Sequence, residues 1–159
     1  MEKKVTEIGV LEFLQSKYRG YFITKKEIEL FSECYEIDVR FDVFHYGIEG
    51  LTNEMIMAGK ACLDTINNHA IKIELALKNY YDTEVKEMAE EMESSYLAIE
   101  DVSQLAQVVE PKELLIRPLK SKIVVGLYFS CSWDEEKGVG IRFDTEGNII
   151  DVGTGEIIY

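Results

Sequence analysis

Apolar and polar residues alternate along the first quarter of the chain, which predicts β-strands. From Tyr35 to Val43 every second residue is apolar, and the residues between them are charged. A period of two over this length indicates a strand with one face on the core and the other in water. Shorter strands are predicted before it, at residues 6–13, 18–24 and 26–31. Ser32-Glu33 suits a tight hairpin connection, so this part is expected to be an antiparallel meander.

The middle of the chain changes to helical spacing. From Ile56 to Tyr80 apolar residues follow one another at steps of three and four, which draws a stripe along one face of a helix. Thr52 or Asn53 provides an N-cap, and poor helix formers at 67–69 interrupt the stripe. The pattern predicts two consecutive helices, about 53–66 and 68–92, packed on the sheet. One bent helix is the first alternative, and a coiled-coil seam is the second.

A short third helix is expected within residues 101–109, capped by Asp101 or Ser103 and stopped by Pro111. Leu114-Leu115-Ile116, closed by Pro118, is predicted to be a short strand at a sheet edge, because proline cannot donate to a ladder.

The last part of the chain returns to strand spacing. Ile123 to Cys131 is apolar on both faces, as in a central strand that is covered on both sides. The acidic turn 134–138 leads to strands at 139–144 and 149–152. The order strands, helices, strands predicts one α+β domain over residues 1–159. It comprises an N-terminal antiparallel meander, a central helical pair, and C-terminal antiparallel strands that complete one sheet system.

Composition restricts the partners of such a domain. With 47% hydrophobic residues, the chain can fill a core without disulfides or metal. Its net charge of −13 disfavours nucleic acid and anionic membrane surfaces, which both attract basic proteins. Three widely spaced cysteines form no disulfide framework and are expected to be buried thiols. No signal peptide or membrane span is recognisable, so we expect a cytoplasmic protein.

The negative charge is concentrated in one part of the chain. Ten acids and two bases between Asp82 and Glu113 give this segment a charge of −8 out of −13. Glu87, Glu90 and Glu91 are spaced by three and four, so they share a helix face. That face is a candidate surface for a basic toxin or nuclease, since complementary charge raises the association rate. The alternative is a merely solvated helix face.

The turn after the central strand is the second candidate site. Trp133 is the only tryptophan, and Asp134 and Glu136 follow it closely. An aromatic anchor beside charges is typical of a binding hot spot. Alternatively, Trp133 covers the end of the core while the acids solvate the turn. The acids do not alternate as in an EF-hand, so we predict no metal site and no cofactor.

No pattern of catalytic residues is present. The two histidines, His45 and His69, have no Cys, Ser or acid at a motif spacing, and we expect the protein not to be an enzyme.

The C-terminal part of the chain has the pattern VxxLYFxCxWDxExGxGIxF, then a short hairpin and a closing DVG…IIY. The residues that form this pattern are Leu127, Tyr128, Phe129, Cys131, Trp133, Asp134, Glu136, Gly138, Gly140, Ile141, Phe143, Val152, Gly153, Ile157 and Ile158. Together with weaker matches at Gly9, Leu11, Glu12, Tyr80 and Tyr81, the chain resembles a family of small acidic bacterial proteins of unknown function.

Some relatives of that family are believed to be immunity proteins of polymorphic toxin systems. The resemblance therefore implies a protein that binds another protein, such as a basic toxin, and carries over no catalytic residues. The alternative from another class is a regulatory domain that binds a small ligand or metal at the Trp133 turn.

Overall fold

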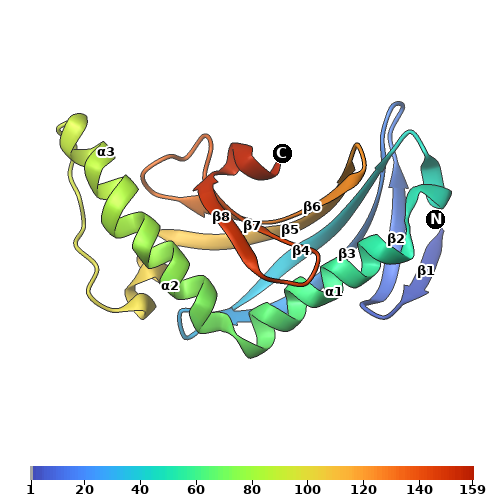
Figure 1. Ribbon diagram of the computed structural model, residues 1–159, viewed down its shortest axis with the longest axis horizontal. Helices are drawn as coiled ribbons and strands as arrows, with labels where there is room; N and C mark the ends of the chain where they lie inside the picture. The colour runs from blue at the N-terminus through green and yellow to red at the C-terminus, as the bar shows by residue number, and fades with distance from the viewer. Residues whose placement is uncertain (1) are drawn as a thin grey trace.

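A computed structural model describes residues 2–159 of the chain. It contains one eight-stranded sheet, and the strands lie side by side in their order along the chain. Helices α1 and α2 lie along the sheet in a V, and α3 continues α2 at the end of the molecule opposite β1 (Figure 1). The predicted α+β class is confirmed, because strands from both ends of the chain form one sheet around a central helical region.

The N-terminal meander is antiparallel throughout. Its strands are β1 Lys3–Thr6, β2 Gly9–Gln15, β3 Gly20–Leu30 and β4 Glu33–Phe44. The predicted strand at 6–13 is wrong at its start. A turn at Glu7 and Ile8 separates β1 from β2, and Gly9 follows it with φ +126°.

The predicted strands at 18–24 and 26–31 are one strand, β3, since no glycine or proline breaks the chain between them. Lys25 stays on the strand because its ammonium pairs with Asp38 across the ladder at 2.9 Å. The hairpin turn is Phe31-Ser32 rather than Ser32-Glu33. Both turn residues have positive φ, as two-residue hairpins with primed turns require. Phe31 tolerates this conformation because its side chain is buried in the core.

The alternation along β4 is confirmed. Its apolar side chains from Ile37 to Val43 are buried against the helices. Asp42, on the other face, is the exception to the prediction, because it is also buried. The Asp42 carboxylate lies 3.4 Å from the Arg19 guanidinium and 3.2 Å from that of Arg40, and these cations offset its burial.

Two helices separated at His69 follow β4, as predicted. α1 is Asn53–Asn68, and the Thr52 hydroxyl accepts a hydrogen bond from the backbone N–H of Met55 at its start. The second predicted helix is α2 Ala70–Tyr80, a π-helical turn Tyr81–Val85, and α3 Lys86–Glu91.

The apolar stripe of these helices packs inside the molecule, so the coiled-coil alternative is wrong. Ile56, Leu63, Ile66, Ile73 and Leu77 all belong to the buried core cluster. Gly59 brings α1 close to the sheet, because a Cβ there would lie 2.9 Å from the Phe41 ring.

The predicted third helix is a 3₁₀ segment, Val102–Gln107. Asp101 caps it and forms a capping box with Gln104. The segment ends four residues before Pro111, which therefore does not stop it.

The prediction of a short edge strand at 114–116 is wrong. β5 is Val109–Leu119 and lies inside the sheet, parallel to β4 on one side and antiparallel to β6 on the other. It tolerates two prolines because its pairing with β4 is limited to 113–116. Pro111 adjoins an irregularity in the β5–β6 register, and Pro118 lies beyond the β4 pairing.

β6 Lys122–Cys131 is a central strand covered on both faces, as predicted. Leu127 and Phe129 face the helical core, while Gly126 faces the C-terminal 3₁₀ segment η4, Gly155–Ile158. β7 Val139–Phe143 and β8 Ile149–Thr154 complete the antiparallel meander. Cys62 and Cys131 are buried thiols, but Cys34 is exposed, which corrects the prediction of three buried thiols.

Candidate functional site

The π-helical turn and α3 bring the two predicted sites to the same end of the molecule. The turn between β6 and β7 lies beside the helix that continues α2 (Figure 1). Tyr81, in the π-helical turn, meets the Trp133 ring edge-on with centroids 5.4 Å apart and stacks on Tyr96 at 5.0 Å. The Tyr81 hydroxyl donates to the Leu97 carbonyl. Trp133 is thereby half-buried and fixed against the helix.

A cleft of about 560 Å³ lies between Trp133 and this helix. We call it the Trp133 cleft; its lining is mostly apolar. It is lined by Tyr81, Val85, Met88, Ala89, Met92, Ser94, Ser95, Tyr96, Leu97, Gln107, Val108, Ser132 and Trp133. Among the predicted site residues, Trp133 is therefore placed in a concave surface.

The predicted acids of the helix border this cleft only in part. Val85, Met88, Ala89 and Met92 line the cleft, so at 100° per residue Glu87 and Glu90 lie on the opposite face of α3. Glu91 lies at the edge of that face and directly precedes Met92. All three carboxylates are exposed.

Asp134 and Glu136 do not line the Trp133 cleft. Asp134 builds the turn, because its carboxylate accepts the Lys137 N–H at 3.0 Å and its carbonyl accepts the Gly138 N–H at 2.9 Å. Gly138 has φ +66°, a left-handed conformation that glycine adopts without strain. Glu136 is exposed on the turn. Thus the structure brings Trp133 to the acidic helix but leaves the two turn acids outside the cleft.

The environment of Cys131 also favours a structural role for this turn. Its thiol lies 3.4 Å from the Asp134 carbonyl, and burial raises its pKa to about 11. Burial also raises the pKa of the Cys62 thiol. Both thiols therefore stay protonated near neutral pH and are poor nucleophiles.

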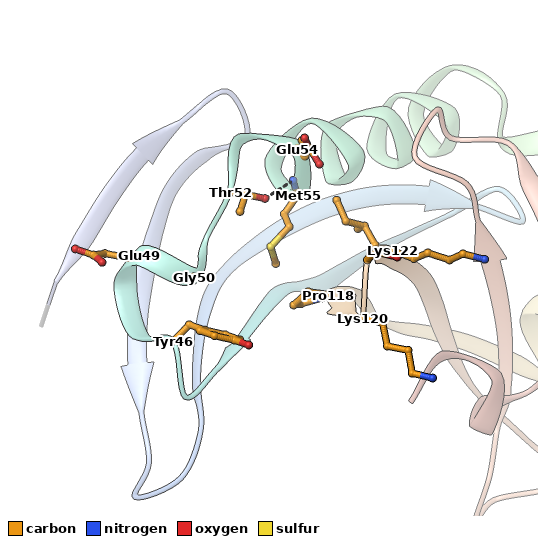
Figure 2. Close-up of a pocket in the computed structure, with 11 residues that line it drawn as sticks. Tyr46, Glu49, Gly50, Thr52, Glu54, Met55, Pro118, Lys120 and Lys122 are labelled. Atoms are coloured by element: carbon orange, nitrogen blue, oxygen red, sulfur yellow. Dashed lines mark hydrogen bonds between the residues drawn. The ribbon is translucent and has the colours of Figure 1, made fainter.

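A second cleft, of about 540 Å³, lies at the other end of β6 and has no counterpart in the sequence-based predictions. It opens where β4 and β5 diverge, beyond their pairing at Phe41 and Ile116. Figure 2 shows Tyr46, Met55 and Pro118 directed toward its centre. The parallel pairing of β4 with β5 brings the segment after β4 near the β5–β6 turn, and nothing in the sequence pattern reveals that pairing.

The charged residues of the second cleft do not converge on one point. Lys120 and Lys122 extend away from its centre in Figure 2, and Glu49 extends outward on the opposite side. The Thr52 hydroxyl is engaged by the cap of α1. The centre is therefore apolar, without the few convergent polar groups that orient a ligand.

Residues 2–159 contain no group of three or more His, Cys, Asp or Glu side chains arranged to hold a metal ion. None of the helices in the same described part is both long and apolar enough to cross a membrane.

Most of the C-terminal sequence pattern has a structural explanation. Gly126 and Gly140 leave room for the Ile158 side chain, and Gly153 leaves room for Ile157. The Arg117 guanidinium donates to the Ile158 carbonyl at 3.1 Å, and the Tyr159 hydroxyl donates to Glu113 at 2.7 Å. These glycines thus form a socket on the face of the sheet that is turned away from the helices. The closing IIY residues of the chain fill this socket.

The family model described as a domain of unknown function, DUF6985, matches residues 9–159. The chain belongs to the DUF6985 family. The match runs from the first residue of β2 to the end of the chain, so it includes both clefts and the socket for Ile158. No curated protein and no solved structure matches the chain. Membership of a family of unknown function is therefore confirmed, while the expected relation to immunity proteins stays a prediction.

Proposed function

We propose that this DUF6985 protein is a bacterial, cytoplasmic protein-binding module of the immunity type, which blocks a basic partner by covering it with the acidic surface of α3. We define the acidic surface as Glu87, Glu90 and Glu91. The Trp133 cleft beside it gives the same end of the molecule an apolar surface, so charge and burial can act on one partner.

The observation that carries the proposal is the position of the acids along the helix. The last turn of α3 contains Glu90 and Glu91 and no basic residue, and Glu93 follows directly. A helix C-terminus carries about −0.5 of a charge, so acids there are unfavourable by roughly 0.3–1 kcal/mol each. A solvated face would satisfy solubility without this cost. The arrangement instead adds to the negative field at one end of the molecule.

These carboxylates are also free of neutralising partners. Within residues 2–159, none of Glu87, Glu90 and Glu91 has a basic nitrogen within 4.0 Å, although many other acids are paired. The nearest ion pair along the helix joins Lys78 to Asp82 at 2.6 Å. Unpaired, exposed carboxylates are available to cations of another protein and attract them over about a Debye length.

The proposal is tested with basic proteins from neighbouring genes, each purified at full length and measured against this protein. The triple variant Glu87→Lys, Glu90→Lys, Glu91→Lys should weaken the complex by about tenfold or more, mainly by slowing association. The association and dissociation rates are measured by surface plasmon resonance at two salt concentrations.

A matched control distinguishes the effect of the acidic surface on the affinity from the effect of the net charge. The triple variant Glu7→Lys, Glu27→Lys, Glu29→Lys changes the charge by the same amount at exposed positions near the end of α1. It should leave the affinity within about threefold of the wild type, because screened charges act locally. Equal affinities of the wild type and the α3 variant, or equal losses in both triple variants, would overturn the proposal.

A further inference from the structure

The Trp133 cleft combines a rigid aromatic wall with adaptable side chains. Trp133 and Tyr81 are held in fixed geometry by each other and by Tyr96. Met88 and Met92 also line the cleft, and their unbranched thioether side chains adapt to different apolar shapes. A cleft that combines fixed and adaptable apolar side chains is suited to bind one apolar side chain inserted by another protein.

Two apolar side chains at the cleft are exposed. Met92 is 74% exposed and Leu97 is 51% exposed, and both line the cleft. Within residues 2–159 no other segment packs over them. Burying this surface against an apolar side chain would contribute about 25 cal/mol for each Å² removed from water.

The charges around the cleft decide which partner fits it. No Lys, Arg, Asp or Glu lines it among the described residues, while the exposed Glu91 and Glu93 flank Met92, which lines it. A second copy of the chain would bring another acidic end to this surface, and its net charge is also −13. Nucleic acid has the wrong sign as well. A basic protein segment with an apolar face matches both the lining and the border.

We propose that the Trp133 cleft receives one large apolar side chain from a basic, amphipathic helix of the partner, while Lys or Arg residues of that helix lie over Glu91 and Glu93. This inference rests on the proposed function, and it deepens it by naming the kind of segment that is bound. The acidic surface governs association, and the cleft governs how long the complex lasts.

The test uses three tryptophan-free peptides of equal length and charge, so that Trp133 is the only tryptophan in the sample. The first is a Lys/Leu peptide whose leucines form one helix face. The second has the same composition with leucines spread around the helix, and the third is Lys/Ser. Affinities come from the anisotropy of a dye on each peptide, and insertion is followed by Trp133 emission.

The amphipathic peptide should bind at least about tenfold more tightly than the other two, and it alone should shift Trp133 emission to shorter wavelength. Replacing Met92 and Leu97 together by Gln should remove that advantage but leave Lys/Ser binding unchanged. Both positions are exposed, so this variant should fold, which far-UV circular dichroism checks.

The outcomes separate the two proposals. Equal binding of all three peptides with no change in Trp133 emission would overturn the cleft inference and leave the acidic surface standing. Binding of all three that is unaffected by the Glu87, Glu90, Glu91 triple variant would overturn the proposed function. A tightly bound amphipathic peptide whose affinity survives Met92→Gln and Leu97→Gln would place the apolar contact elsewhere and also overturn the inference.

Discussion

At the scale of single residues, Gly126 is a position where packing leaves no room for a side chain. A Cβ there would lie 2.2 Å from the Ile158 Cγ2 and 2.4 Å from its Cβ, and Ile158 is fully buried. Gly126→Ala should therefore lower the free energy of unfolding by about 1–3 kcal/mol, the usual cost of overpacking. Urea unfolding measures this.

The partner of the clash provides the control for this prediction. Ile158→Ala alone also destabilises, because it removes buried methyl groups. The double variant Gly126→Ala, Ile158→Ala should be more stable than the sum of the two effects implies, by about 1 kcal/mol. Additive effects would contradict the proposed clash between these two side chains.

The cysteines differ in accessibility, and this predicts their reactivity. Cys34 is exposed on β4, whereas Cys62 and Cys131 are buried and their pKa values are raised by burial. Native protein at pH 8 should react rapidly with one equivalent of a thiol reagent such as DTNB, and with three equivalents in denaturant. Cys34→Ser should abolish the rapid phase; a rapid phase that remains would contradict this assignment.

At the scale of elements, the end of α3 carries strain that a substitution can relieve. Glu93 follows the helix with φ +52°, and the Ser94 N–H closes the turn onto the Ala89 carbonyl at 2.9 Å. This is the position that glycine favours after a helix. Glu93→Gly should raise the free energy of unfolding by about 1 kcal/mol, since it removes both a left-handed side chain and an acid at the negative end of the helix.

The same substitution inside the helix provides the comparison. Glu87→Gly should destabilise by roughly 0.5–1 kcal/mol, because glycine is unfavourable in a helix interior. Thermal unfolding distinguishes the two directly. A loss of stability in both variants would show that Glu93 makes a favourable contact that outweighs its backbone strain.

The elements also show what a sequence pattern can predict. The alternation along β4 and the stripe from Ile56 to Leu77 follow local periodicity, and both are confirmed. β5 was misjudged because its prolines are tolerated only through the limited pairing with β4. The contact between Trp133 and Tyr81 joins residues distant in sequence, and the π-helical turn that presents Tyr81 has no recognised sequence signal. Therefore Trp133 can be singled out from the sequence, but its packing against the helix and the cleft that this packing forms cannot.

At the scale of the whole molecule, Trp133 reports on how the helices and the C-terminal strands unfold together. It sits on the turn between β6 and β7 and packs against Tyr81 after α2. If the chain is one cooperative unit, urea unfolding followed by Trp133 emission and by far-UV circular dichroism should give the same midpoint. An earlier midpoint for Trp133 emission would mean that α3 and its turn separate from the sheet first.

The distribution of charge over the molecule gives the remaining prediction, which concerns salt. The protein has a net charge of −13 and unpaired acids at the negative end of α3, so repulsion between carboxylates destabilises the folded state. Raising NaCl from about 0.05 to about 0.5 M shortens the Debye length to a few Å and should stabilise the protein by about 1 kcal/mol. In the variant Glu90→Gln, Glu91→Gln, stability at low salt should be higher and the gain from NaCl smaller, because less repulsion is left to screen. Thermal unfolding of both proteins in the two buffers measures the difference. If NaCl stabilised both equally, the repulsion would lie outside the end of α3, and the acids there would not be the costly feature on which the proposed function depends.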